Sequence, residues 1–147
     1  MSRFPTKYLL AILLLPLWSA CGNLSRKDTK EQKIVNNGQA KVEFAKDFHN
    51  FGELEAREQI SYSFKFHNLG DGILRIDSIQ NDCACMKITF PQEDIMPQDF
   101  SYVDVLFNPA GEYGRVFKQI KVFCNAQTEP VELTLVADVS NPMFDKL

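Results

Sequence analysis

The densest chemical signal in the sequence is the segment Cys83-Ala84-Cys85. In an extended strand, residues two apart point to the same face, and their Cα atoms lie about 6.6 Å apart. That separation is at the far limit for a disulfide, so direct pairing of Cys83 with Cys85 requires a bend in the chain. Three roles fit the pair: a structural role, with one or both thiols buried or one of them bonded to Cys124; a redox or disulfide-exchange pair; or a soft-metal site for copper(I) or zinc.

The structural role is favoured over the redox and metal roles. A zinc site normally takes four ligands, and this segment supplies two. For copper(I), Met86 or Met96 could add a thioether, although Met86 would face away from Cys85 in a regular strand. Cys124 lies beside Val122 on an apolar face, which is typical of a small core side chain. We expect Cys124 to bond one member of the pair or all three thiols to stay reduced, with no cofactor or resident metal.

The remaining side chains offer little for acid–base or nucleophilic catalysis. The sequence holds only two histidines, His49 and His67, and neither belongs to a Ser/His/Asp motif. We expect both to be solvated, His49 in a turn and His67 on the polar face of a strand. The formal net charge is −3, and no cluster of Lys and Arg provides the basic surface that nucleic acid requires. The sequence therefore predicts a protein that is not an enzyme and has no nucleic-acid partner.

The elements that carry these residues are expected to be strands. Ile60, Tyr62, Phe64 and Phe66 alternate with polar residues, which is the period of a half-buried strand. Turn residues follow, and two of them, Gly70 and Gly72, are able to take positive φ angles. Similar patterns predict strands at 42–44, 51–54, 60–67, 74–79, 86–90, 102–107, 116–124 and 131–137.

Seven or eight short strands with this spacing predict an all-β fold, an immunoglobulin-like antiparallel β-sandwich, as a single domain over residues 41–147. Lys118 is an anomaly, because it interrupts an otherwise apolar face. The apolar faces of the strands predict the core: Phe64, Phe66, Ile76, Val105, Ile120, Val122, Leu133 and Leu135.

Residues 1–20 have the parts of a secretory signal peptide. Two positive residues are followed by an apolar run that is too short to cross a bilayer, and two small residues precede Cys21. This segment resembles the lipobox of bacterial lipoproteins, with Trp18 in place of the usual Leu. The resemblance implies that Cys21 is acylated and becomes the new N-terminus.

Residues 21–40 are polar and predict a flexible tether after the lipidated cysteine. The whole pattern predicts localisation to the cell envelope, with a lipid anchor in a membrane, the outer membrane being favoured. The domain is then expected in the periplasm or at the cell surface, and its expected partner is another envelope protein.

A series of short motifs along the domain resembles the bacterial family named domain of unknown function 1573. The resemblance covers about Val42 to Val139 and implies an immunoglobulin-like sandwich, similar to domains of cilia and sperm-motility proteins. Gln98 and Cys124 depart from the residues that are common in the family, Gly and Ser. The motifs are Asn50-Phe51-Gly52, Phe64-Lys65-Phe66-His67-Asn68-Leu69-Gly70, Leu74-Arg75-Ile76, Cys83-Ala84-Cys85, Ile95-Met96-Pro97, Lys118-Gln119-Ile120-Lys121-Val122, Asn125 and Pro130-Val131-Glu132-Leu133.

Two classes of function follow from these features. The favoured one is a non-enzymatic binding or scaffold module, in which loops or an edge strand contact another envelope protein. The alternative is a lipoprotein that handles thiols or copper through Cys83 and Cys85. Fold class alone does not choose between them.

Overall fold

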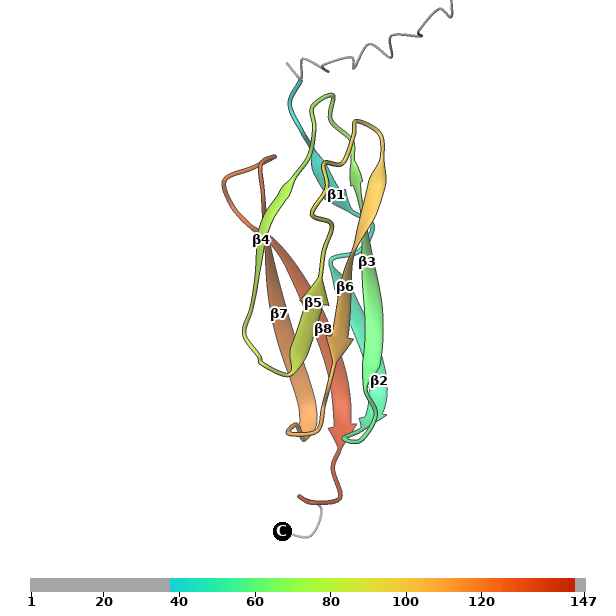
Figure 1. The fold of residues 1–147 in the computed structure, drawn as a ribbon. Helices are drawn as coiled ribbons and strands as arrows, with labels where there is room; N and C mark the ends of the chain where they lie inside the picture. The colour runs from blue at the N-terminus through green and yellow to red at the C-terminus, as the bar shows by residue number, and fades with distance from the viewer. Residues whose placement is uncertain (1–37, 145–147) are drawn as a thin grey trace, which may run out of the picture. The chain divides into compact units, whose positions relative to one another are not determined.

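The computed structural model describes residues 38–144, which form eight β-strands (Figure 1). The strands are β1 (Val42–Phe44), β2 (Phe48–Glu55), β3 (Ile60–Asn68), β4 (Ile76–Asn81), β5 (Met86–Thr89), β6 (Phe100–Phe107), β7 (Gly114–Cys124) and β8 (Val131–Ser140). This part of the chain holds no helix that could cross a membrane. The predicted signal peptide, Cys21 and the tether up to residue 37 lie outside the described residues.

The strands form two four-stranded sheets, ordered β1-β3-β6-β5 and β2-β8-β7-β4 (Figure 1). The predicted all-β sandwich of seven or eight strands is therefore confirmed. One pairing differs from a wholly antiparallel arrangement, because β2 runs parallel to β8. Only residues 45–47 separate β1 from β2, and the chain changes sheet there instead of making a hairpin.

The core lies between the two sheets, and every predicted core residue is buried in it. The period of two in the sequence is responsible, since one face of each strand points toward the opposite sheet. Leu74 and Ile95, which were not predicted, join the core through an isolated bridge between the two loops that carry them. The buried predicted residues are Phe64, Phe66, Ile76, Val105, Ile120, Val122, Leu133 and Leu135.

A buried polar side chain, Asn68, organises the loops at one end of the sandwich. Its Nδ2 donates to the carbonyl oxygens of Gly72 at 2.7 Å and Ile95 at 3.0 Å. Its Oδ1 accepts from the backbone N–H groups of Gly70 at 3.1 Å and Lys41 at 3.3 Å. The side chain thus adds four hydrogen bonds to the backbone hydrogen bonds that these irregular segments make with one another.

Gly70 and Gly72 could take positive φ angles, but neither does so in the structure. Glycine is required there for another reason. A Cβ at Gly70 would collide with the backbone of Gln39, and a Cβ at Gly72 would collide with the backbone of Gly38. The absence of side chains lets two loops approach closely around Asn68.

His49 lies in β2 rather than in a turn, and its ring stacks on Tyr62 with centroids 3.6 Å apart. Partial burial, followed by the charge of Lys46, lowers the pKa of His49 from the usual 6.5. The unfolded chain therefore binds the proton more readily. The contribution of neutral His49 to stability is complete above pH 6.5 and is lost as the pH falls through the lowered pKa.

We expect an NMR titration of His49 to show a midpoint below 6.5. Replacing Tyr62 by Ser exposes the imidazole and should move the midpoint upward. A midpoint at or above 6.5 in the unsubstituted protein would contradict the effect of burial.

Candidate functional site

Cys83 and Cys85 form a disulfide in the structure, contrary to the expectation that they would not pair. The physical reason is that the segment is a turn between β4 and β5, and not part of a strand. The bend brings the two Cα atoms to 5.1 Å, inside the usual range for a disulfide. The backbone N–H of Met86 donates to the carbonyl oxygen of Cys83 at 3.3 Å and helps to close the turn.

Cys124 is a free, buried cysteine, so the proposed bond from Cys124 to Cys83 or Cys85 is also wrong. Cys124 pairs with Ile76 at the start of β4, whereas Cys83 follows the end of that strand. The length of β4 separates them by roughly 16 Å, far beyond the reach of a disulfide. The prediction that Cys124 is a small core side chain is confirmed.

These assignments predict the number of reactive thiols. A chain carrying Cys21→Ser, to remove the remaining cysteine, should show no reactive thiol when folded and one, from Cys124, in denaturant. Reduction before denaturation should raise the count to three. Two or more thiols in the unreduced, denatured protein would contradict the Cys83–Cys85 disulfide.

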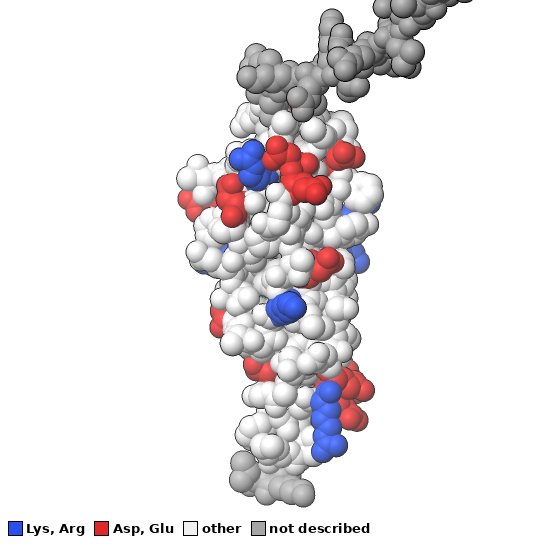
Figure 2. All heavy atoms as spheres, in the orientation of Figure 1, with Lys and Arg blue, Asp and Glu red and all other residues white. Residues whose placement is uncertain are grey.

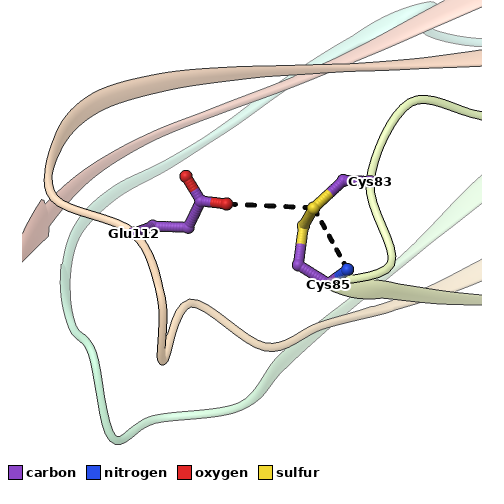
Figure 3. Close-up of side chains that lie close together, drawn as sticks. All are labelled: Cys83, Cys85 and Glu112. Carbon is purple, nitrogen blue, oxygen red and sulfur yellow. Dashed lines mark hydrogen bonds between the residues drawn. A yellow bond between two sulfur atoms is a disulfide. The ribbon is translucent and has the colours of Figure 1, made fainter.

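A carboxylate faces the disulfide from the connection between β6 and β7 (Figure 3). The Oε1 atom of Glu112 lies 3.8 Å from the Sγ of Cys83 and accepts a hydrogen bond from the Nζ of Lys118 at 2.7 Å. The side chains of Glu112 and Lys118 are only 21% and 15% exposed, so this ion pair is far better shielded from water than an ordinary surface pair.

The local backbone holds Glu112 in place. Its N–H donates to the carbonyl oxygen of Pro109, and its own carbonyl oxygen accepts from the side chain of Asn141. Sequence reasoning missed Glu112, but Lys118 gave an indirect signal. A lysine on the apolar face of β7 needs a nearby anion, and Glu112 is that anion.

The three ligand-type atoms of Cys83, Cys85 and Glu112 lie within 4.8 Å of one another. This set fits a metal poorly, because both sulfur atoms are already bonded to each other. The two methionines considered for copper(I) do not complete it. Met86 is buried in the core, and Met96 lies in the connection beyond the far end of β5.

A second feature lies on the outer side of the β1-β3-β6-β5 sheet, where three rings and one lysine form a surface that we call the aromatic face. Its residues are Lys65, His67, Phe100 and Tyr102. In the register of β3 and β6, His67 lies opposite Phe100 and Lys65 opposite Tyr102. Phe100 packs edge-on against Tyr102 at 5.9 Å and lies 5.7 Å from the ring of His67. The Nζ of Lys65 lies 4.0 Å from the centroid of Phe100, whose residue remains 50% exposed.

Charged residues, unlike these rings, are not gathered in one place on the side of the domain that Figure 2 shows. On the side of the domain shown in Figure 2, basic and acidic residues occur in small groups of both signs, separated by uncharged surface. The described residues drawn there form no broad area of a single sign. The described residues on that side therefore produce no long-range field of a single sign.

Comparison with known proteins gives a family and a fold. Residues 42–139 match the model of a family described as "Protein of unknown function (DUF1573)". A protein of unknown function from Porphyromonas gingivalis W83 is similar in structure, with a TM-score of 0.58 and 18% identity over 69% of this chain and 46% of that one. This chain thus spans less than half of that protein. No curated protein matched the sequence.

The ASH / PapD-like domain 7 of human CEP192 is similar too, with a TM-score of 0.58 and 13% identity over 70% of this chain and 87% of that one. The VesB protease of Vibrio cholerae is similar with a TM-score of 0.54 and 14% identity over 68% of this chain and 32% of that one. At these identities the likeness concerns the sandwich fold alone.

Proposed function

Since the chain belongs to the DUF1573 family, whose function is unknown, we propose its role from its own surface: a lipid-anchored cell-envelope protein that binds another envelope protein through the aromatic face. In this role the aromatic face acts by binding alone and catalyses no reaction. The lipid on Cys21 holds it at a membrane, and the polar segment that follows gives the domain reach. The tether predicted for residues 21–40 ends earlier, because Ala40 is buried in the core and the carbonyl oxygen of Gln39 accepts hydrogen bonds from Asp71 and Gly72.

The observation that carries this proposal is the exposure of Phe100 and Tyr102, at 50% and 42%, beside one another on one sheet. Exposed aromatic rings are enriched at the centres of protein interfaces, where they bury much area at low conformational cost. Contacts with Lys65 and His67 hold Phe100 in place before any partner binds. Such preorganisation reduces the entropy lost on binding.

The shape of this surface favours a macromolecule over a small ligand. The aromatic face is the outer side of a sheet, and the neighbouring hollow, lined in part by Pro91 and Tyr102, is open and has a volume of about 280 Å³. A ligand there would stay largely in water, whereas small-molecule sites enclose most of their ligand. Ser63, which donates a hydrogen bond to Asp104, supplies part of the polar rim that interfaces commonly have.

Anchoring is tested by labelling cells of the native type with a fatty acid. The chain should incorporate the label and partition into detergent, and Cys21→Ser should abolish both. An unlabelled mature chain, or one that retains residues 1–20, would contradict the anchor.

Binding is tested by placing a photo-crosslinking amino acid at Tyr102 and irradiating intact cells. We expect one discrete adduct, which is lost when Phe100 is also replaced by Ser. The matched control is the replacement of Phe117, which is 62% exposed on β7 of the other sheet, by Ser. If that control removes the adduct equally, or if Tyr102 gives no adduct, the aromatic face is not the binding surface.

A further inference from the structure

We propose that the Cys83–Cys85 disulfide is a thiol–disulfide exchange centre that oxidises dithiols of extracytoplasmic proteins, with Glu112 handling the proton and Lys118 positioning Glu112. This activity is additional to the proposed binding role and does not depend on the aromatic face. Three features support this activity: the location of the disulfide, the groups around its sulfur atoms and the shielded ion pair beside it.

The disulfide contributes little as a structural crosslink. It joins residues two apart within one turn, so it ties no separate elements together. A crosslink stabilises a protein less when the loop that it closes is shorter, and this loop is near the minimum length. Both cysteines are also partly exposed rather than buried, unlike Cys124.

The two sulfur atoms have different surroundings, and the difference identifies the one that is attacked. The carboxylate of Glu112 lies 3.8 Å from the Sγ of Cys83, where it can accept a hydrogen bond from the thiol that forms when the disulfide opens (Figure 3). The backbone N–H of Cys85 donates to the Sγ of Cys83 at 3.1 Å and stabilises negative charge on that atom. Attack is therefore directed to the Sγ of Cys85, and Cys83 is the leaving group.

The reaction balances as follows. A thiolate of the substrate attacks the Sγ of Cys85, the Cys83–Cys85 bond breaks, and a mixed disulfide forms between the substrate and Cys85. The second substrate thiol loses its proton and attacks the first substrate sulfur, which releases Cys85. Two electrons pass from the substrate dithiol to the cysteine pair. The substrate's two protons go to solvent. Cys83 and Cys85 each take one proton from solvent, and the new thiol of Cys83 donates it in a hydrogen bond to Glu112.

Glu112 is the group placed to handle the proton at Cys83. After the disulfide opens, a thiol at Cys83 has a carboxylate oxygen within reach as a hydrogen-bond acceptor. Lys118 neutralises Glu112, since its Nζ lies 2.7 Å from the same oxygen. Without Lys118, a bare carboxylate would oppose the negative charge that develops on Cys83.

The test uses the full chain carrying Cys21→Ser and a reduced peptide with two cysteines as the probe. The oxidised chain should oxidise one peptide per molecule. Its rate should exceed, by at least about tenfold, that of a linear peptide of residues 81–87 with the same disulfide. When a monothiol replaces the peptide and the reaction is stopped with acid, the trapped mixed disulfide should be found on Cys85.

Glu112→Gln should lower the rate about tenfold or more and flatten its pH profile. Glu112→Asp should retain the pH dependence, which separates loss of the carboxylate from loss of local structure. The matched control is Glu93→Gln, because Glu93 is an exposed acid of the β5–β6 connection. This substitution should change neither the rate nor its pH profile.

Several outcomes would overturn the proposal. These are a rate no greater than that of the linear peptide, a mixed disulfide on Cys83, or a pH profile that Glu112→Gln leaves unchanged. Tight binding of copper(I) by the reduced chain, without dithiol oxidation by the oxidised chain, would assign the pair to metal handling instead.

Discussion

Replacing Phe66 by Ala should lower the free energy of unfolding by about 3–5 kcal/mol. Phe66 is fully buried, and its ring packs 5.2 Å from that of Phe44 across the β1–β3 pair. The substitution removes the transfer free energy of the ring and leaves a cavity that the surrounding strands fill only in part. A domain of this size is stabilised by about 5–15 kcal/mol, so the variant should be close to unfolding at ordinary temperatures.

Denaturant unfolding, followed by circular dichroism, measures this effect directly. The control is Phe117→Ala, because Phe117 is 62% exposed and its loss should change stability by less than about 0.5 kcal/mol. Equal losses for the two variants would mean that Phe66 does not belong to the core. A spectrum dominated by helix would contradict the sandwich itself.

The second large effect is expected at Asn68, where Ala should cost roughly 2–4 kcal/mol. The amide makes four hydrogen bonds with backbone groups. Its removal takes a donor from the carbonyl oxygens of Gly72 and Ile95, of which only that of Ile95 keeps another, the N–H of Leu74. Buried polar groups that lose their partners carry most of the cost of such a substitution. Asn68→Asp should be no better, because it places a carboxylate oxygen against two carbonyl oxygens.

Asn125 offers a matched control for Asn68. It also bridges loops, accepting from the N–H of Arg75 and donating to the carbonyl oxygen of Ile73, but it is exposed to water. Asn125→Ala should therefore cost no more than about 1 kcal/mol in thermal or denaturant unfolding. Similar costs at the two positions would mean that burial does not set the contribution of Asn68.

The strands and the core could be predicted because their signal is local. Ile60 to Phe66 alternates with a period of two, and a strand with one buried face has no other satisfactory register. The same reasoning could not find Asn68, since its role depends on loops that begin 27 residues away in both directions. Nor does a strand pattern indicate that β2 pairs in parallel with β8, which is a property of the whole topology.

The candidate site was less predictable than the fold. Cys83 and Cys85 stood out by type, but treating their segment as extended led to the wrong pairing. The turn forms because β4 and β5 belong to different sheets, and the chain must reverse between them. Glu112 lies 29 residues from Cys83, and only the two sheets together bring them close.

The parallel pairing of β2 with β8 has a mechanical consequence. The described chain enters the sandwich at one end and leaves it at the other (Figure 1). A force that pulls these two ends apart acts along β2 and β8 in opposite directions. It loads their hydrogen bonds in shear, and those along the paired segments from Phe48 to Glu55 must then yield together rather than one at a time. A domain pulled by its two ends would thus resist extension before its sheets separate.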